Sequence, residues 1–152
     1  MTAKIIPMAE EHLEQVIKII EALPEWFDID ARTRAIPIDL QFQEVYVAED
    51  DGQIVGFITL YVAEGRVNIG WLGVHPDDQR KGIGSQLIEA AEDYCRQKGI
   101  MELAVYTLGE SVDYEPYEST RDFYLKHGFA VYQSSQTDNP GCPEEIRLKK
   151  YV

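Results

Sequence analysis

Cysteines, basic residues and long apolar runs are all scarce in this chain, and each shortage excludes a class of protein. Only Cys95 and Cys142 are cysteine among 152 residues, and they lie far apart with no metal-ligand pattern around them. The longest uncharged apolar run, Ile54 to Ala63, has ten residues, whereas a membrane span needs roughly 18. The opening stretch MTAKIIPMAEEHLEQ has no continuous apolar core before a small-residue cleavage site, so no secretion signal is predicted. We therefore expect a reduced, cytoplasmic protein without a metal ion.

Positive charge is also in short supply. The chain has 14 Lys and Arg residues against 27 Asp and Glu residues, for a net charge of -13. Such a field repels polyanions, which argues against general nucleic-acid binding and against adhesion to an anionic membrane. It would suit a cationic substrate, although an acidic surface also serves solubility.

What the chain does contain is enough apolar sequence for one folded domain. Hydrophobic residues make up 45% of it and aromatic residues 11%, which is typical of a globular protein. Its length predicts a single domain over residues 1–152 with a hydrophobic core. The oligomeric state is left open, a homodimer included.

Hydrophobic periodicity predicts an α/β (α+β) fold. Apolar residues at helical spacing indicate helices over 9–23, 28–36, 82–98 and 117–127, the first two ended by Pro24 and Pro37. Strand patterns cover 4–8, 44–48, 53–62, 67–74, 101–108, 130–134 and 145–151. Two tight glycine-containing turns join the strands of 44–74 into an antiparallel meander, and single helices between later strands imply parallel pairing in the middle. We expect a mixed sheet of about seven strands with helices on both faces.

One short stretch, VHPDDQRKGIGSQL at 74–87, changes from strand to helix through a basic, glycine-rich turn. Pro76 ends strand pairing because it has no N–H to donate. The first N–H groups of the following helix have no internal partner, so the helix start attracts an anion such as a phosphate. Gly82 and Gly84 remove side chains that would hold the anion away, and Arg80 and Lys81 add positive charge. The turn lacks the spacing of the nucleoside-triphosphate and dinucleotide loops. A plain helix-capping turn is the alternative.

Two motifs carry a family resemblance. Residues 74–84 match the pattern V-x-P-x-x-[QR]-x-x-G-x-[GA], and TRDFYLKHGF at 120–129 is similar to the pattern A-x-x-F-Y-x-x-x-G-F. Together with the predicted order of helices and strands, they make the chain resemble the GNAT superfamily of acyl-CoA-dependent N-acyltransferases. The resemblance covers the whole chain and implies the GNAT fold.

The resemblance implies a binding mode for acetyl-CoA. Strand 67–74 would bend at a bulge and splay away from strand 101–108, and the pantetheine arm would lie in the wedge like an added strand. The pyrophosphate would rest on the glycine-rich turn. The implied cofactor-binding residues are Leu72, Gly73, Val74, Gln79, Arg80, Lys81, Gly82, Ile83, Gly84 and Ser85.

For catalysis, the resemblance implies that Tyr124 is the general acid that protonates the departing thiolate. Its phenol is a donor at neutral pH, and a backbone N–H near Val74 would stabilise the thioester oxygen. An FY pair on an amphipathic helix is also typical of a core. His127 lies at a helix C-terminus, where the dipole favours it, and we assign it no chemical role.

The general base stays open. Many relatives carry a glutamate on the strand before the turn, but VNIGWLGV at 67–74 has no acid. Glu64, Asp113 and Glu115 are the candidates, acting through a water chain. His75, beside Pro76, is expected to face solvent.

The acceptor side is expected to combine acids with aromatic residues, which favours a cationic amine. The candidate substrate-binding residues are Trp26, Phe27, Asp113, Tyr114 and Tyr117. In relatives the position of Tyr117 often holds an asparagine that bonds the pantetheine arm, so here the phenol replaces that contact or it is lost. Packing of the helix junction is the alternative role for Trp26 and Phe27.

The sequence therefore predicts an N-acetyltransferase that moves an acetyl group from acetyl-CoA to a primary amine by direct attack in a ternary complex. A catalytically silent acyl-CoA-binding or sensing module is the main alternative. A scaffold protein with a merely capped helix is the third reading.

Overall fold

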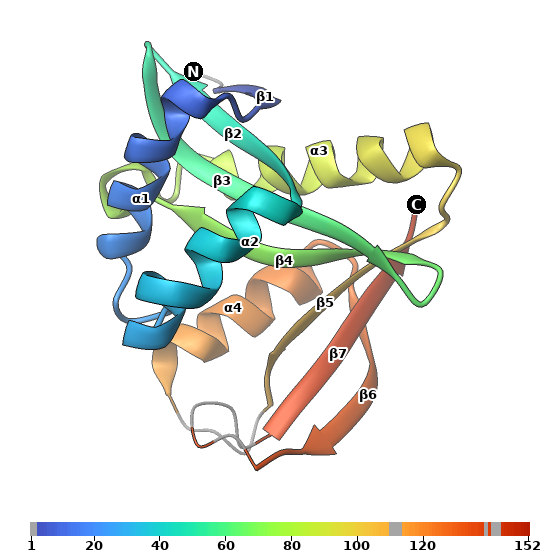
Figure 1. Ribbon diagram of the computed structural model, residues 1–152. Helices are drawn as coiled ribbons and strands as arrows, with labels where there is room; N and C mark the ends of the chain where they lie inside the picture. Colours follow the sequence, from blue (N-terminus) through green and yellow to red (C-terminus); the bar gives the residue numbers. More distant parts are fainter. Residues whose placement is uncertain (1–2, 110–113, 139, 141–143) are drawn as a thin grey trace.

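The computed structural model describes residues 3–109, 114–138, 140 and 144–152, and Figure 1 shows how its elements are arranged. The strands are β1 (Lys4–Pro7), β2 (Glu44–Asp50), β3 (Gln53–Ala63), β4 (Arg66–Val74), β5 (Glu102–Leu108), β6 (Ala130–Gln136) and β7 (Glu144–Tyr151). The α-helices are α1 (Leu13–Glu21), α2 (Ile36–Phe42), α3 (Ile83–Lys98) and α4 (Glu115–Lys126). Short helical turns occupy η1 (Glu10–His12), η2 (Ala31–Ala35) and η3 (Pro76–Asp78).

The helix before β2 runs through Pro37, so the predicted end at Pro37 was wrong. Residues Ala31–Ala35 form a π turn, and the Ile36 N–H donates to the Ala31 carbonyl, five residues back. Pro37 directly follows this π turn, inside a helix that runs without a break from residue 29 to Phe42. The wider turn accommodates the proline ring, which has no N–H to donate. The helix therefore continues to Phe42, and its Asp39 carboxylate accepts the Trp71 Nε1–H of β4 at 2.8 Å.

The seven strands form one mixed sheet in the order β1-β2-β3-β4-β5-β7-β6. Strands β1 to β4 are antiparallel neighbours, β4 and β5 are parallel, and β7 is antiparallel to both β5 and β6. The predicted mixed α/β sheet, its meander and its central parallel pair are confirmed. The insertion of the last strand between β5 and β6 has no local signature in the sequence.

Helices cover both faces of the sheet (Figure 1), and each face has its own apolar core. On one face α1, α2 and the loop between them pack on β2 and β3; the largest buried side chains there are Val16, Ile19, Ile20, Ile36, Val47 and Phe57. On the other face α3 and α4 pack on β3, β4, β5 and β7 through Ile58, Leu60, Leu87, Ile88, Leu103 and Leu148. Apolar residues at helical spacing thus meet alternating strand residues, which fixes each helix over its sheet face.

A bulge in β4 opens the sheet. Ile58 pairs with Leu72 and Leu60 with Ile69, so two β4 residues oppose the single β3 residue Thr59. The buried Thr59 hydroxyl accepts the Trp71 N–H at 2.8 Å, which satisfies a donor that the bulge removes from the ladder. Within the described residues β4 and β5 pair only from Val67–Leu103 to Ile69–Val105. The expected bulge and splay are confirmed, and the wedge lies beyond Ile69.

Cys95 lies fully buried on α3, and burial raises the pKa of its thiol to about 11. Because the thiolate is the reactive form, Cys95 should stay unmodified by iodoacetamide near pH 8 in the native protein and react once urea unfolds it. Mass spectrometry of the Cys95 peptide measures this. Labelling of that peptide at equal rates in the native and unfolded states would contradict the expectation.

Candidate active site

The glycine-rich turn leads into α3 as predicted, and it leaves the first N–H groups of the helix without acceptors. Gly82 is the N-cap in the left-handed conformation, with φ of 81°, and no side chain caps the helix. The first N–H with an intrahelical partner is that of Gln86, which donates to the Gly82 carbonyl. In the described part of the chain the N–H groups of residues 83–85 have no protein acceptor. These donors, at the positive end of a 16-residue helix, suit a phosphate oxygen.

The two glycines of the turn serve different purposes. At Gly82 an added Cβ would meet nothing within 4 Å, so the backbone conformation is what requires glycine. At Gly84 an added Cβ would lie 3.1 Å from the ring of Phe123 on α4. Gly84 thus allows α4 to approach α3 closely.

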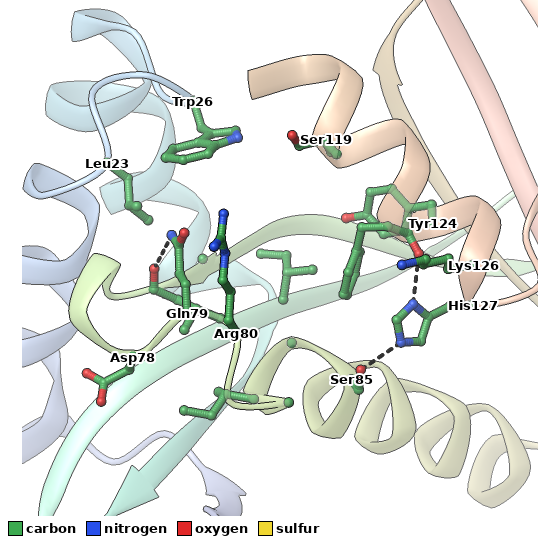
Figure 2. A pocket seen from close by; sticks show the side chains of 18 of the residues that line it. Leu23, Trp26, Asp78, Gln79, Arg80, Ser85, Ser119, Tyr124, Lys126 and His127 are labelled. Carbon is green, nitrogen blue, oxygen red and sulfur yellow. Dashed lines mark hydrogen bonds between the residues drawn. The ribbon is translucent and has the colours of Figure 1, made fainter. Parts of the chain in front are cut away.

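The two basic residues of the turn have different surroundings. Arg80 adopts a positive φ of 66° and points its guanidinium along the cavity wall beside Gln79 (Figure 2). Lys81 lies outside the cavity lining, and its Nζ pairs with the Asp78 carboxylate at 3.1 Å. Lys81 therefore neutralises an acid next to the turn, whereas Arg80 faces the space where an anion would lie.

A cavity of about 540 Å³ joins the turn to the wedge between β4 and β5. Nine of the ten expected cofactor-binding residues line it: Leu72, Gly73, Val74, Gln79, Arg80, Gly82, Ile83, Gly84 and Ser85. The Val74 carbonyl accepts a hydrogen bond from Gln79 Nε2 at 3.1 Å, so this carbonyl already has a protein partner.

Tyr124 is buried on α4 with 4% of its surface exposed, yet its hydroxyl points into the cavity from the wall opposite Arg80 (Figure 2). Among the described residues no hydrogen bond joins this hydroxyl to another group. Burial raises the pKa of Tyr124 above its ordinary value, so the phenol keeps its proton at neutral pH. The rings of Phe123 and Phe129 each pack edge-on against the Tyr124 ring, with ring centroids 5.3 Å apart in both pairs.

A second cavity of about 360 Å³ adjoins the first, and five residues line both cavities: Trp26, Phe27, Leu72, Thr120 and Tyr124. Its walls come from the α1–α2 loop, the bulge of β4, the end of β5, α4 and β7. Trp26, Phe27, Trp71, Tyr106 and Tyr117 give it an aromatic lining. Tyr124 therefore lies where a ligand in one cavity would meet a ligand in the other.

The expected acceptor-binding aromatics join the α1–α2 loop to α4. Trp26 Nε1 donates to the Pro116 carbonyl at 3.1 Å, and the Tyr117 hydroxyl donates back to the Trp26 carbonyl at 3.2 Å. Phe27 is buried edge-on against Trp71 at 5.7 Å. Tyr114 is exposed, and its ring contacts that of Tyr117 at a tilted angle, with centroids 5.1 Å apart; it lines neither cavity. Asp113 lies outside the described residues.

The carboxylates considered for the base lie away from both cavities or outside the described chain. Glu64 pairs with Arg66 and Arg147 at 3.5 and 3.4 Å and is absent from the described lining. Glu115 begins α4 and is exposed. His75 is likewise absent from the described lining, and its Nδ1 accepts the Asp77 N–H.

The two cavities differ in the charge of their walls. Asp28, Asp30 and Glu145 line the second cavity, and no lysine or arginine does so among the described residues. Arg34 binds both oxygens of Asp30 at 2.8 Å. Asp28 Oδ1 accepts the Ala31 N–H at 2.8 Å, and Glu145 Oε1 lies 3.4 Å from Arg147 Nε. In the first cavity the balance is reversed, because Arg80 and Lys126 line it and the one carboxylate of its described lining, Asp78, is paired with Lys81.

Sequence reasoning missed several residues of this site. Trp71 is anchored by its Nε1 to Asp39 Oδ2 of α2 at 2.8 Å and walls the second cavity. Glu145 reaches the site only because β7 lies next to β5, and His127 does so through contact between α3 and α4. The signal available in the sequence was the tryptophan at 71 in an otherwise small and aliphatic strand.

The arrangement of sheet, wedge and helices is that of solved GNAT structures. A GNAT-family protein from Desulfovibrio desulfuricans gives a TM-score of 0.82 at 18% identity, with 98% of each chain covered. PaiA N-acetyltransferase from Thermoplasma acidophilum, solved in complex with coenzyme A, gives 0.74 at 20% identity, with 100% of each chain covered. The fold is therefore the GNAT acetyltransferase fold.

The sequence itself establishes the family. Residues 41–131 match the family model of the acetyltransferase (GNAT) domain, and the chain belongs to this family. Spermidine N(1)-acetyltransferase of Thermoplasma acidophilum is 30% identical to it over 89 residues, which cover 58% of this chain and 51% of that protein. The chain spans about half the length of the curated relatives it matches.

None of the described helices has the length and apolar character that crossing a membrane requires. No group of three or more His, Cys, Asp or Glu residues is placed to hold a metal ion in the part of the chain the structure describes.

Proposed function

We propose that the protein transfers an acetyl group from acetyl-CoA to the primary amine of a small cationic acceptor. The observation that carries the proposal is the set of unpartnered N–H groups at the start of α3, at one end of a cavity that leads to Tyr124. The splay of β4 from β5 supports a ligand that runs from the turn into the sheet. A merely capped helix would need neither the open donors nor the cavity.

The residues present fit acetyl-CoA, which supplies the acetyl group as a thioester. Gly82, the N–H groups of residues 83–85 and the Arg80 guanidinium would hold the diphosphate. Leu72 and Gly73 would flank the pantetheine arm in the wedge. Lys81 is left to its ion pair with Asp78.

The chemistry assigned to Tyr124 follows from its position and protonation. The amine nitrogen attacks the thioester carbonyl carbon, the C–N bond forms as the C–S bond breaks, and the amine gives up its proton to solvent. A backbone N–H near Val74 would stabilise the thioester oxygen as negative charge develops on it. Tyr124 donates its proton to the departing thiolate and regains one from solvent. Direct attack in a ternary complex needs both cavities filled together, which their junction at Tyr124 supports.

The acceptor class follows from the second cavity. Asp28 and Glu145 line a cavity with aromatic walls, and its described lining adds no lysine or arginine. Carboxylates and aromatic faces both stabilise ammonium groups. An amine that carries a second positive charge should therefore bind better than a singly charged one.

The test is thiol release from acetyl-CoA with a panel of amines. We expect 1,4-diaminobutane, spermidine and related cations to be acetylated with a kcat/KM about ten-fold above that of butylamine. Aminoglycosides and lysine peptides define how large an acceptor fits. No thiol release with any amine, despite tight acetyl-CoA binding, would favour the silent sensing module and contradict the proposed transfer.

Removing the acidic charges of the second cavity should weaken the acceptor and spare the cofactor. Asp28→Asn keeps an oxygen for the Ala31 N–H, and Glu145→Gln keeps the side-chain shape. We expect each variant to raise the KM of a diamine about ten-fold, equivalent to about 1.4 kcal/mol, with an unchanged KM for acetyl-CoA. Asp93→Asn, on α3 and outside the described lining, is the control. An equal effect of the control variant would contradict the assignment.

A further inference from the structure

A serine–histidine pair lies at the start of α3, inside the first cavity. Ser85 Oγ is 2.8 Å from His127 Nε2, and His127 Nδ1 is 2.7 Å from the Phe123 carbonyl oxygen (Figure 2). Because a carbonyl only accepts, Nδ1 carries the hydrogen, and in the neutral ring Nε2 accepts the Ser85 O–H. Both side chains line the cavity.

We propose that His127 takes up a proton when acyl-CoA binds, so that cofactor affinity increases as the pH falls. The inference rests on the proposed function, because it needs the cofactor diphosphate at the N-terminus of α3. It gives a role in cofactor binding to a residue to which the sequence assigned none.

The argument begins with the single hydrogen of the Ser85 hydroxyl. Ser85 is the third residue of α3, among the open N–H groups, and its side chain is exposed to the cavity. A phosphate oxygen at this position attracts the O–H, which then turns away from His127. Neutral Nε2 would be left facing an oxygen lone pair. A protonated ring restores the bond, because Nε2–H then donates to Ser85 Oγ while Nδ1–H still donates to Phe123.

The charges around His127 make its protonation depend on the bound anion. Lys126 precedes it on α4 and lines the same cavity, and Arg80 lies on the opposite wall. On β7, Lys150 Nζ donates to the His127 carbonyl at 2.7 Å and pairs with Glu92 of α3. These cations and the positive end of α3 oppose an imidazolium, whereas Glu92 and the C-terminus of α4 favour it. A diphosphate adds negative charge beside the ring and shifts that balance towards the charged form.

The sign of the pH dependence follows by linkage. If the bound diphosphate stabilises the protonated ring of His127, affinity is greatest at acidic pH, where the free protein already carries that proton. Affinity falls as the pH rises and the proton must be taken up on binding.

The experiment uses dephospho-CoA, because the 3′-phosphate of CoA has its own ionisation near about pH 6. Isothermal titration calorimetry between about pH 5.5 and 8.5, in two buffers of different ionisation enthalpy, gives both Kd and the protons taken up. We expect Kd to rise about ten-fold over this range, with net proton uptake at neutral pH. The NMR titration of the His127 ring, with and without ligand, measures the shift directly in the unmodified protein.

Variants separate His127 from other titrating groups. In His127→Gln the amide NH₂ donates to Ser85 at every pH, so Kd should no longer change with pH. His75→Gln, beside the turn but outside the described lining, should keep the wild-type pH dependence. A flat wild-type profile, or an unchanged slope in His127→Gln, overturns this inference while cofactor binding stands. No binding of dephospho-CoA or acetyl-CoA at any pH overturns the proposed function instead.

Discussion

Replacing Tyr124 with phenylalanine is expected to lower kcat by about 10²- to 10⁴-fold, the usual contribution of a positioned acid. The ring packs against Phe123 and Phe129, and no hydrogen bond joins the hydroxyl to another group among the described residues, so the substitution leaves the core intact. Because the cofactor contacts lie elsewhere in the cavity, the Kd for acetyl-CoA should change by less than about three-fold. Steady-state kinetics and calorimetry on the same preparations measure the two effects.

The pH profile adds a second readout for Tyr124. Burial raises the pKa of its phenol, so Tyr124 stays protonated through the physiological range and produces no fall in rate there. Any alkaline limb in that range should therefore keep its position in Tyr124→Phe. Tyr132→Phe, on β6 and outside the described lining of both cavities, is the control and should retain full activity. Equal losses in kcat and in cofactor affinity would count against an acid role.

Replacing Gly82 with valine should weaken acetyl-CoA binding by at least about 100-fold, or about 2.7 kcal/mol. The substitution meets no steric obstacle, but a β-branched residue is strongly disfavoured at a φ of 81°. The turn must then change its backbone angles, which moves the N–H groups of residues 83–85 away from the diphosphate. Calorimetry with acetyl-CoA measures the loss.

The opposite end of α3 offers a matched control. Gly99 is the C-cap of the same helix, with a φ of 70° and open space where its Cβ would lie. Gly99→Val should therefore lower the Tm about as much as Gly82→Val and leave cofactor affinity unchanged. Unchanged affinity in Gly82→Val would refute the phosphate site, and equal loss in both variants would indicate a general loss of structure.

Most helices and strands were predictable because their signals are local. The α3 helix is set by apolar residues at helical spacing and by Gly82 and Gly99 at its ends. The bulge of β4 followed from the family resemblance, whereas the helix through Pro37 did not follow from any pattern. A π turn directly before that proline lets the helix continue through it, and local propensity rules do not predict such a turn.

The site was predictable only where a motif lies within one turn of chain. The glycine-rich turn and Tyr124 each belong to a continuous pattern, so their neighbours along the chain identified them. Ser85 and His127 are 42 residues apart, and Glu145 pairs with Leu108, 37 residues earlier in the chain. No spacing in the sequence reports such contacts, because side-chain distance across a fold depends on which strands and helices pack together.

The sequence by itself determined most of the elements, the glycine-rich turn before α3 and the family, because hydrogen bonding and apolar periodicity act between residues close along the chain. Only the tertiary structure decided that β7 lies between β5 and β6, that two cavities of opposite charge meet at Tyr124, and that His127 faces Ser85. The physical reason is that burial and charge are properties of surroundings. Those surroundings exist only after distant segments have packed against one another.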